Sequence, residues 1–225
     1  MPQFRLRDGA ELYYETHGSG PPLFLVAGLG GDGRFWDAQL AELSRHFTVT
    51  VHDHRGTGRS TLSRIPYSVA QMADDALQLI EGLGYDKVHW CGHSTGGAMG
   101  QVLAIEHPHR LDRLVLSATW AKTDAFFRRL FEVRSLMLRE LGPLAYLKSS
   151  TLALNMPSWV RDHDAELAAA EAKAKETIPV PEIVLSRIAA ITAHDQRDRL
   201  PTVRVPTLAI CARDDVVTPL YFTEE

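Results

Sequence analysis

Short apolar runs alternate with amphipathic segments along most of this chain of 225 residues, a pattern that predicts strands interleaved with helices. The predicted strands cover residues 3–7, 11–17, 23–27, 48–52, 87–91, 114–117 and 206–211. Helices are predicted between them over residues 36–44, 68–83 and 98–105. Because strands that alternate with helices form mostly parallel sheets through right-handed crossovers, the predicted fold class is α/β, with helices on both faces of the sheet.

Local signals predict how some of these elements begin and end. Asp8 and Gly9 are typical of a two-residue turn that joins the first two strands. Ser68 is expected to cap the helix that follows it, and Gly84 is expected to end that helix.

From residue 120 to about residue 200 the strand pattern stops and only helical signals remain. Helices are predicted over residues 124–141, 144–154, 158–175 and 181–192; Gly142 and Pro143 end the first, and Ser158 caps the third. A helical insertion between two strands of one sheet is a cap. We therefore expect a core formed by residues 1–119 and 201–225, and a helical cap over residues 120–200 inserted after the sixth strand.

The segment Gly92-His93-Ser94-Thr95-Gly96 lies between a predicted strand and a predicted helix. Gly-x-Ser-x-Gly in this context is a nucleophile elbow, a turn that holds one serine hydroxyl above the edge of a sheet. Side chains at positions 92 and 96 would collide with the neighbouring strand or helix. The following helix directs its N-terminal amides toward negative charge that forms beside the serine. This context favours a nucleophilic Ser94 over a purely structural glycine turn.

A second glycine-rich loop, residues 28–33, follows the strand predicted over residues 23–27. A serine that transfers acyl groups needs a second backbone N–H for the developing oxyanion, normally from the loop after an early strand. Leu29 occupies that position, and Thr95 would supply the other N–H. Alone, this loop would be an ordinary strand-to-helix turn; beside the elbow, it predicts an oxyanion hole.

With these motifs the chain resembles the α/β-hydrolases, from Phe4 to its C-terminus. Residues 53–60, Asp-His-Arg-Gly-Thr-Gly-Arg-Ser, are similar to a loop of this superfamily. The resemblance implies that Asp53 and Arg55 hold this loop in place near the active site and do not react. It also implies that the cap encloses the substrate, although a purely structural cap remains an alternative.

The acid of the catalytic triad is expected after the last predicted strand, because α/β-hydrolases follow the chain order serine, acid, histidine. Asp215 is the preferred residue, since in similar hydrolases the acid stands four residues before the proline that is here Pro219. Asp214 is the alternative acid, and a solvated turn is the remaining interpretation of this segment.

No histidine of the chain is placed to accept the proton of Ser94 in a standard arrangement. We expect the His93 side chain to point away from the reacting face, and His194 to precede the last strand at its opposite end. In similar hydrolases the histidine follows one more helix and strand after the acid. The sequence therefore predicts an incomplete domain that lacks a C-terminal strand and helix, with its general base beyond Glu225.

Within the superfamily the chain resembles the aminoacrylate (carbamate) hydrolases of pyrimidine degradation. This resemblance rests on residues 28–31, 35–36, 67–73, 127–134, 156–159 and 210–215. The 3-oxoadipate enol-lactonases share the elbow, the acid loop and the strand before it, and remain the alternative, together with a general carboxylesterase. Both families act on small carboxylates, which makes Trp120, Arg128, Arg129 and Arg134 candidates for binding the substrate. A solvated helix face is the other interpretation of the three arginines.

The implied activity is that of a serine hydrolase that transfers an acyl group to water through a Ser-His-Asp triad, with no cofactor and no metal. His52, Asp53 and His54 alternate at a strand end without further ligands nearby, which disfavours a metal site. A pseudo-hydrolase that binds a small ligand without turnover is the alternative from another class. The pair Ser94 and Asp215 argues against it.

The composition adds few constraints. The net charge of −4 mixes both signs, so neither nucleic acid nor an anionic membrane is expected as a partner. No apolar run reaches the roughly 18 residues of a membrane-spanning helix, and no signal peptide is seen, which favours the cytoplasm. Cys91 and Cys211 are expected as small buried residues and not as a disulfide. The expected partner is a small-molecule substrate, and a homodimer is left open.

Overall fold

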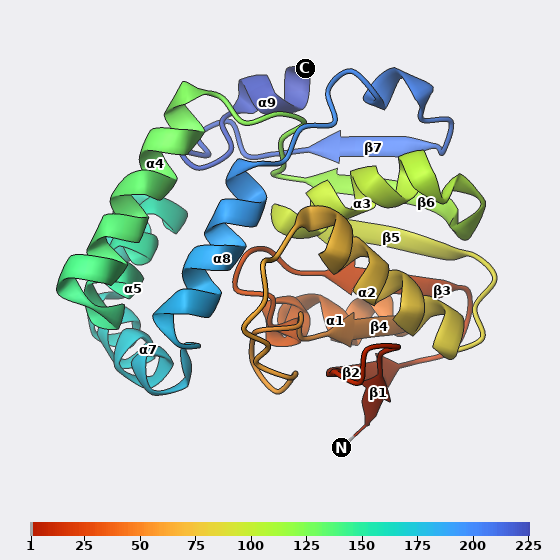
Figure 1. The fold of residues 1–225 in the computed structure, drawn as a ribbon, viewed down its shortest axis with the longest axis horizontal. Helices are drawn as coiled ribbons and strands as arrows, with labels where there is room; N and C mark the ends of the chain where they lie inside the picture. Colours follow the sequence, from red (N-terminus) through yellow and green to blue (C-terminus); the bar gives the residue numbers. More distant parts are fainter. Residues whose placement is uncertain (1) are drawn as a thin grey trace.

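The apolar runs form one sheet in the computed structural model, which describes residues 2–225. Its strands are β1 (Gln3–Arg5), β2 (Glu11–His17), β3 (Pro22–Val26), β4 (Thr48–His52), β5 (Val88–His93), β6 (Leu111–Ser117) and β7 (Thr207–Ile210). Their order across the sheet is β1-β2-β4-β3-β5-β6-β7 (Figure 1). The pairs β1–β2 and β2–β4 are antiparallel and the other pairs are parallel. The predicted α/β class with a mostly parallel sheet is confirmed.

Helices cover both faces of this sheet, as predicted. They are α1 (Asp37–Leu43), α2 (Val69–Gly82) and α3 (Thr95–Glu106), and α2 and α3 lie in front of the sheet in Figure 1. Alternate side chains of β3 point to opposite faces, as the pleat requires. Phe24 and Val26 belong to the larger apolar cluster, which includes α2 and α3. Leu23 and Leu25 belong to a smaller cluster with Trp36, against which α1 packs.

Capping residues set the ends of α2 as predicted. The Ser68 hydroxyl accepts a hydrogen bond of 3.0 Å from the Gln71 N–H at the start of the helix. Gly84 follows the end of α2 with a φ of +75°, a conformation that glycine adopts at little cost. The first hairpin is wider than predicted: Arg5 pairs with Glu11, so the loop contains more residues than Asp8 and Gly9.

Between β6 and β7 the chain forms a cap of helices that lies beside the sheet in Figure 1. The cap helices are α4 (Ala125–Leu136), α5 (Pro143–Leu154), α6 (Pro157–Asp162), α7 (Asp164–Thr177) and α8 (Pro181–Thr192), with a π-helical turn over Met137–Leu141. An insertion at this place was predicted after the sixth strand. The exact division into a core and a cap stays a prediction.

One predicted cap helix is divided into two. The sequence predicts a single helix over residues 158–175 with Ser158 as its cap, but α6 begins at Pro157 and ends before His163. The His163 ring nitrogen Nδ1 lies 3.0 Å from the Trp159 carbonyl oxygen, and the two rings stack with centroids 3.6 Å apart. A side chain that hydrogen bonds the backbone in this way competes with the regular helix, so the prediction of one continuous helix was wrong.

The strand β7 forms an edge of the sheet in the described residues. Its side chains are exposed, including Leu208 at 56% and Ile210 at 45%. Cys211 directly follows it and is half-buried, as is Cys91 on β5; both are free thiols. The cysteines are therefore less buried than predicted. Even so, burial raises the pKa of the Cys91 thiol to about 11.

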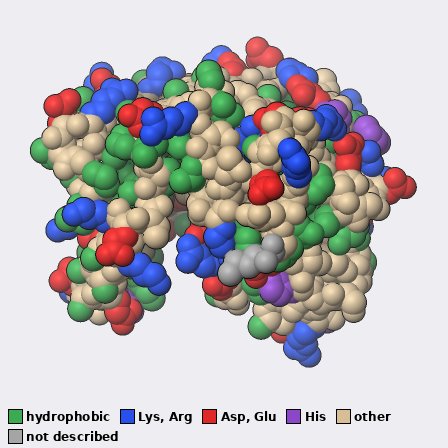
Figure 2. Space-filling view, turned by 60° about the horizontal axis from the view of Figure 1, so that its bottom comes forward, with side chains coloured by type: hydrophobic (Ala, Val, Ile, Leu, Met, Phe, Trp, Pro, Cys, Tyr) green, Lys and Arg blue, Asp and Glu red, His purple; other side chains and the backbone are tan. Residues whose placement is uncertain are grey.

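No helix within residues 2–225 is long and apolar enough to cross a membrane. Figure 2 shows acidic and basic side chains interspersed over one face of the molecule, in agreement with the mixed charge of the sequence.

Candidate active site

Ser94 occupies a strained turn between β5 and α3, as the nucleophile elbow predicts. Its φ of +52° and ψ of −114° are rare for a residue with a side chain. The Ser94 N–H donates to the Ser117 carbonyl at 2.8 Å, and the Thr119 hydroxyl donates to the Ser94 carbonyl at 2.8 Å. Strain of this kind costs about 1–3 kcal/mol, persists only where neighbouring contacts enforce it, and is typical of functional sites.

Both glycines of the elbow are required by backbone contacts, as predicted. A Cβ atom at Gly92 would collide with the Gly96 carbonyl, and a Cβ atom at Gly96 would collide with the Val26 carbonyl. Because these obstacles are backbone atoms within packed elements, they cannot move aside easily. The elbow therefore brings β5, α3 and β3 closer together than side chains would allow.

The loop of residues 28–33, here called the oxyanion loop, lies directly against Ser94. A Cβ atom at Gly28 would stand 3.2 Å from the Ser94 Cβ and 3.6 Å from its Oγ. The Gly31 N–H donates to the Gly28 carbonyl at 2.8 Å, closing a turn with Leu29 in its middle. No acceptor is found for the Leu29 N–H among the described residues. Thr95 is the first residue of α3, so its N–H has no partner within the helix.

Asp215 is held by the loop after β7. Its carboxylate accepts hydrogen bonds from the N–H groups of Val217 and Thr218, both at 2.8 Å, and from the Thr218 hydroxyl at 3.1 Å. Asp214 is exposed and makes no side-chain hydrogen bond within the described chain. Ordered hydrogen bonds on Asp215 suit a group that must orient another side chain, which supports Asp215 over Asp214.

Ser94, Asp214 and Asp215 line one cavity of about 460 Å³, here called the Ser94 cavity. The cap contributes residues 152–157 to its wall. Thus the structure brings together the predicted nucleophile, both candidate acids and a segment of the cap, as expected for a cap that encloses a substrate.

His93 also lines the Ser94 cavity, so the prediction that its side chain points away from the reacting face was wrong. The strand pleat places His93 on the same face as Cys91, where its ring stacks on Phe35 with centroids 4.7 Å apart. Burial lowers the pKa of His93, although the Asp215 carboxylate acts in the opposite direction. The sequence contained a signal for this position: side chains alternate along β5, so His93 had to lie on the same face of the sheet as His89 and Cys91.

No histidine among residues 2–225 forms a hydrogen bond with the Ser94 hydroxyl. The His93 Nδ1 atom lies 3.4 Å from the Ser117 hydroxyl instead. His194 is buried away from the Ser94 cavity, with its Nε2 atom 3.0 Å from the Gln101 amide oxygen. His194 thus does not contact Ser94, as predicted, but its predicted place at the opposite end of the last strand was wrong: its ring lies 5.9 Å from the Trp120 ring, just after the end of β6.

The loop of residues 53–60 is fixed by ionic contacts, as the resemblance implied. The Asp53 carboxylate accepts from the Gly33 N–H at 2.9 Å and pairs with the Arg59 guanidinium at 2.8 Å. Arg55 donates two hydrogen bonds, of 2.9 and 2.7 Å, to the Asp75 carboxylate on α2. Asp53 thus ties this loop to the oxyanion loop, while Arg55 ties it to α2.

Trp120 and Arg134 lie inside the protein and do not line the Ser94 cavity. Trp120 is fully buried, with its ring 4.6 Å from the Phe127 ring. Arg134 is 6% exposed and donates to the Ser150 hydroxyl at 2.8 Å within the cap. The structure therefore does not bring these two predicted substrate-binding residues to Ser94, because packing of the cap occupies both side chains.

Arg128 and Arg129 lie on the exposed face of α4. Arg128 donates to the Thr123 carbonyl at 3.0 Å and borders a groove between α4 and α8, away from Ser94. The alternative interpretation of a solvated helix face fits both arginines better than substrate binding does.

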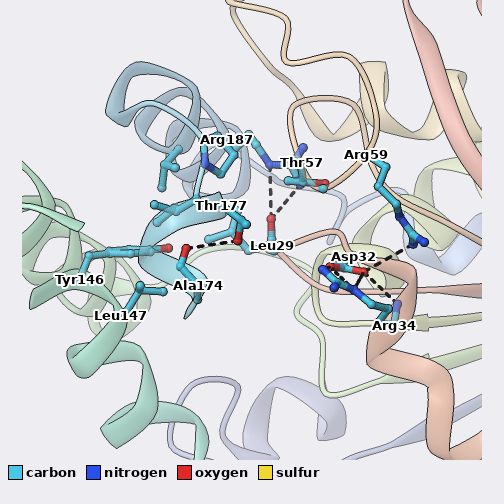
Figure 3. A pocket seen from close by; sticks show the side chains of 15 residues that line it. Leu29, Asp32, Arg34, Thr57, Arg59, Tyr146, Leu147, Ala174, Thr177 and Arg187 are labelled. Carbon is cyan, nitrogen blue, oxygen red and sulfur yellow. Dashed lines mark hydrogen bonds and ion pairs between the residues drawn. The ribbon is translucent and has the colours of Figure 1, made fainter. Parts of the chain in front are cut away.

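A second cavity, of about 410 Å³, lies between the cap and the oxyanion loop (Figure 3). Leu29 and Thr57 line it from the core, and Tyr146 and Arg187 line it from the cap. Figure 2 shows a hollow with basic side chains between cap and core. The sequence prediction missed Arg187, although a charged residue four positions from Ile183 on the apolar stripe of a helix was a visible signal.

The chain matches the model of the α/β-hydrolase fold family over residues 21–224. The chain belongs to the α/β-hydrolase family. A relative from Azorhizobium caulinodans, named "Putative carbamate hydrolase RutD", is 40% identical over 214 residues, which cover 95% of this chain and 81% of that protein. A relative of the same name from Caulobacter sp. strain K31 is 39% identical, with coverage of 93% and 80%.

Solved structures agree with this assignment. A hydrolase from Pseudomonas aeruginosa has a TM-score of 0.90 at 29% identity, covering 99% of this chain and 84% of its own. The enol-lactonase from Burkholderia xenovorans LB400 has a TM-score of 0.89 at 28% identity, covering 99% and 85%. Together with the family and the named relatives, these similarities identify the chain as a hydrolytic enzyme.

Proposed function

We propose that this enzyme is a serine hydrolase of small acyl compounds that carry a carboxylate, with Ser94 as its nucleophile. The observation that carries the proposal is the strained elbow of Ser94, which lies against the oxyanion loop and shares a cavity with Asp215. A hydroxyl held in this way, beside two backbone N–H groups without partners in their own turn or helix, suits attack on a carbonyl carbon.

In the proposed reaction the Ser94 Oγ forms a bond to the carbonyl carbon, and its proton passes to a histidine that Asp215 orients. The N–H groups of Leu29 and Thr95 stabilise the negative charge on the carbonyl oxygen, helped by the N-terminal end of α3. The leaving group takes the proton from the histidine. A water molecule then attacks the acyl-serine and gives its proton to the histidine, which returns the proton to the Ser94 Oγ as the acid is released. The histidine is expected to follow Asp215 in the chain order of the family, and the reaction requires no cofactor.

The proposed substrate class rests on the relatives named carbamate hydrolase, which favour cleavage of a carbamate or an aminoacrylate-like compound. Similarity to the enol-lactonase of Burkholderia xenovorans favours a second candidate, hydrolysis of a small lactone. Both candidates use the same nucleophile and oxyanion hole. We also propose that the enzyme acts in the cytoplasm on a small molecule; its two free cysteines agree with a reducing compartment.

Covalent labelling tests the nucleophile. Intact-mass spectrometry after treatment with a fluorophosphonate should show one adduct that maps to Ser94, and none in Ser94→Ala. Ser117→Ala is a matched control, because this serine lies at the end of the neighbouring strand β6. Equal labelling of Ser94→Ala and the wild type would overturn the assignment.

A substrate panel tests the substrate class. It comprises nitrophenyl esters from acetate to octanoate, an enol-lactone, and a carbamate with a carboxylate group. The small acids should have the highest kcat/KM. Highest values for the long neutral esters would instead indicate a general carboxylesterase.

A further inference from the structure

Arg187 is a buried arginine of the cap that contacts the oxyanion loop. It lies on α8 and is 2% exposed, on the same helix face as Ile183 and Ile191. Burial lowers the pKa of Arg187 to about 10, so the guanidinium is still charged at neutral pH. Within the described residues all of its hydrogen-bond acceptors are neutral groups, and none is a carboxylate.

The guanidinium joins the oxyanion loop to the loop of residues 53–60. Its Nη2 and Nε atoms lie 2.8 and 3.3 Å from the Leu29 carbonyl oxygen (Figure 3). Its Nη1 atom donates to the Arg55 carbonyl at 2.7 Å, and Nη2 lies 3.2 Å from the His54 Nδ1 atom. Burial keeps the pKa of His54 well below its ordinary value, so this ring is neutral and Nδ1 can accept.

The oxyanion loop depends on such external contacts because glycine gives it little conformational preference of its own. Gly30 is exposed, and no atom lies within 4 Å of the position where a Cβ would stand. After Gly30, the Gly31 carbonyl accepts from the His54 N–H at 2.6 Å and from the Thr57 hydroxyl at 3.0 Å. Before Gly30, Arg187 is the side chain that binds the Leu29 carbonyl.

Packing alone does not require an arginine at this place. A buried charge without an ionised partner is costly, and an unbranched apolar residue such as methionine would suit the apolar face of α8. The hydrogen bonds to backbone carbonyls offset this cost. One acceptor is the carbonyl of Leu29, the residue whose N–H is the proposed oxyanion donor. The others belong to the loop of residues 53–60, which supports the oxyanion loop.

We propose that Arg187 is a positioning residue: by holding the Leu29 carbonyl it fixes the Leu29–Gly30 peptide, and with it the orientation of the adjoining peptide whose Leu29 N–H points toward the oxyanion. The proposal rests on the proposed function, because it assumes that Leu29 donates to the reacting carbonyl oxygen. It further implies that the oxyanion hole is ordered only when α8 is seated on the core.

Three variants of the full chain separate this role from others. Arg187→Met removes all donors, Arg187→Lys retains the charge and one donor group, and Arg161→Met is the control because that cap arginine is exposed. Each variant is assayed for kcat and KM on nitrophenyl acetate. Hydrogen–deuterium exchange of residues 28–33 and the melting temperature are measured on the same samples.

Arg187→Met should lower kcat by about 10- to 100-fold, an effect no larger than that of removing an oxyanion donor. KM should change by less than about threefold. Exchange in residues 28–33 should become faster, and Arg187→Lys should recover part of both properties. A raised KM with unchanged kcat would overturn the proposal in favour of substrate binding. Faster exchange throughout the protein, without recovery in Arg187→Lys, would indicate a merely structural role.

The two proposals fail in different ways. If Ser94→Ala hydrolyses the ester as fast as the wild type, the proposed function fails. The exchange experiment still decides whether Arg187 orders the oxyanion loop, and unchanged exchange in Arg187→Met would refute this inference.

Discussion

His194 should make the stability of the fold sensitive to mild acid. Its ring is 6% exposed, and its Nε2 atom lies 3.0 Å from the Gln101 Oε1 atom. The Gln101 amide nitrogen donates to the Trp120 carbonyl at 3.0 Å, which sets the orientation of the amide and leaves Oε1 as an acceptor. The neutral His194 ring therefore carries its proton on Nε2. Burial lowers the pKa of His194 from 6.5 to about 4.

The direction of the effect follows from which state binds the proton. Below pH 6.5 the unfolded chain takes up a proton at His194, whereas the folded protein does not do so until about pH 4. The contribution of His194 to the free energy of unfolding is therefore complete above pH 6.5 and is lost as the pH falls toward 4. This difference in pKa corresponds to about 3 kcal/mol in total. About 2 kcal/mol of it should be lost by pH 5.

Urea unfolding at pH 7.5 and pH 5.0 measures this loss. His194→Gln is the informative variant, because its amide N–H can still donate to Gln101 but does not titrate. Between the two pH values the wild type should lose about 2 kcal/mol more than this variant. His109→Gln is the control, since the His109 side chain is exposed. It should lose as much as the wild type.

Two other buried histidines, His52 and His54, also affect the comparison between the wild type and His194→Gln. Burial lowers the pKa of His52 to about 4 and that of His54 well below its ordinary value. Both should add to the acid sensitivity of the wild type and of His194→Gln alike, so the difference between the two proteins isolates His194. Equal losses in both proteins would show that the His194 ring is not held neutral in the folded state, and would refute the reasoning.

Two further predictions concern the acid and the elbow. Asp215→Asn should lower kcat by about 10⁴-fold while the melting temperature changes little, and Asp214→Asn should do far less; the reverse order of effects would assign the acid to Asp214. Gly96→Ala should destabilise the protein by more than about 3 kcal/mol in thermal unfolding, because its Cβ would collide with the Val26 carbonyl. Gly30→Ala, where a Cβ meets no atom within 4 Å, should cost much less, and similar losses in both variants would contradict this account.

The sequence predicted those parts of the site that depend on local backbone geometry. The elbow could be recognised because a strained Ser94 needs glycine on both sides, at Gly92 and Gly96. Asp215 was predicted from the resemblance to hydrolases whose acid stands four residues before a proline, which is Pro219 here. Each of these signals lies within a few residues, where the chain itself fixes the geometry.

Contacts between distant segments could not be predicted in this way. Arg187 meets Leu29 across 158 positions of sequence, and nothing near either residue indicates the other. The same limit applies to Arg134, whose charge suggested a bound anion but whose guanidinium donates to the Ser150 hydroxyl inside the cap. A charged residue on an apolar helix stripe indicates a buried partner, yet only the fold shows which one.

In the proposed mechanism the oxyanion is stabilised by backbone groups, and this explains both why its sequence signal was indirect and where Arg187 matters. The proposed oxyanion donors, Leu29 and Thr95, act through their N–H groups, so their side chains carry no direct signal. Their identity had to be inferred from the glycines around them. Thr95 is fixed by α3, whereas Leu29 lies in a glycine-rich turn that has no helix to hold it. The less constrained of the two proposed donors thus lies on the residue whose own carbonyl is bound by a side chain from the cap. Control of the reaction by the cap would be most effective at this residue.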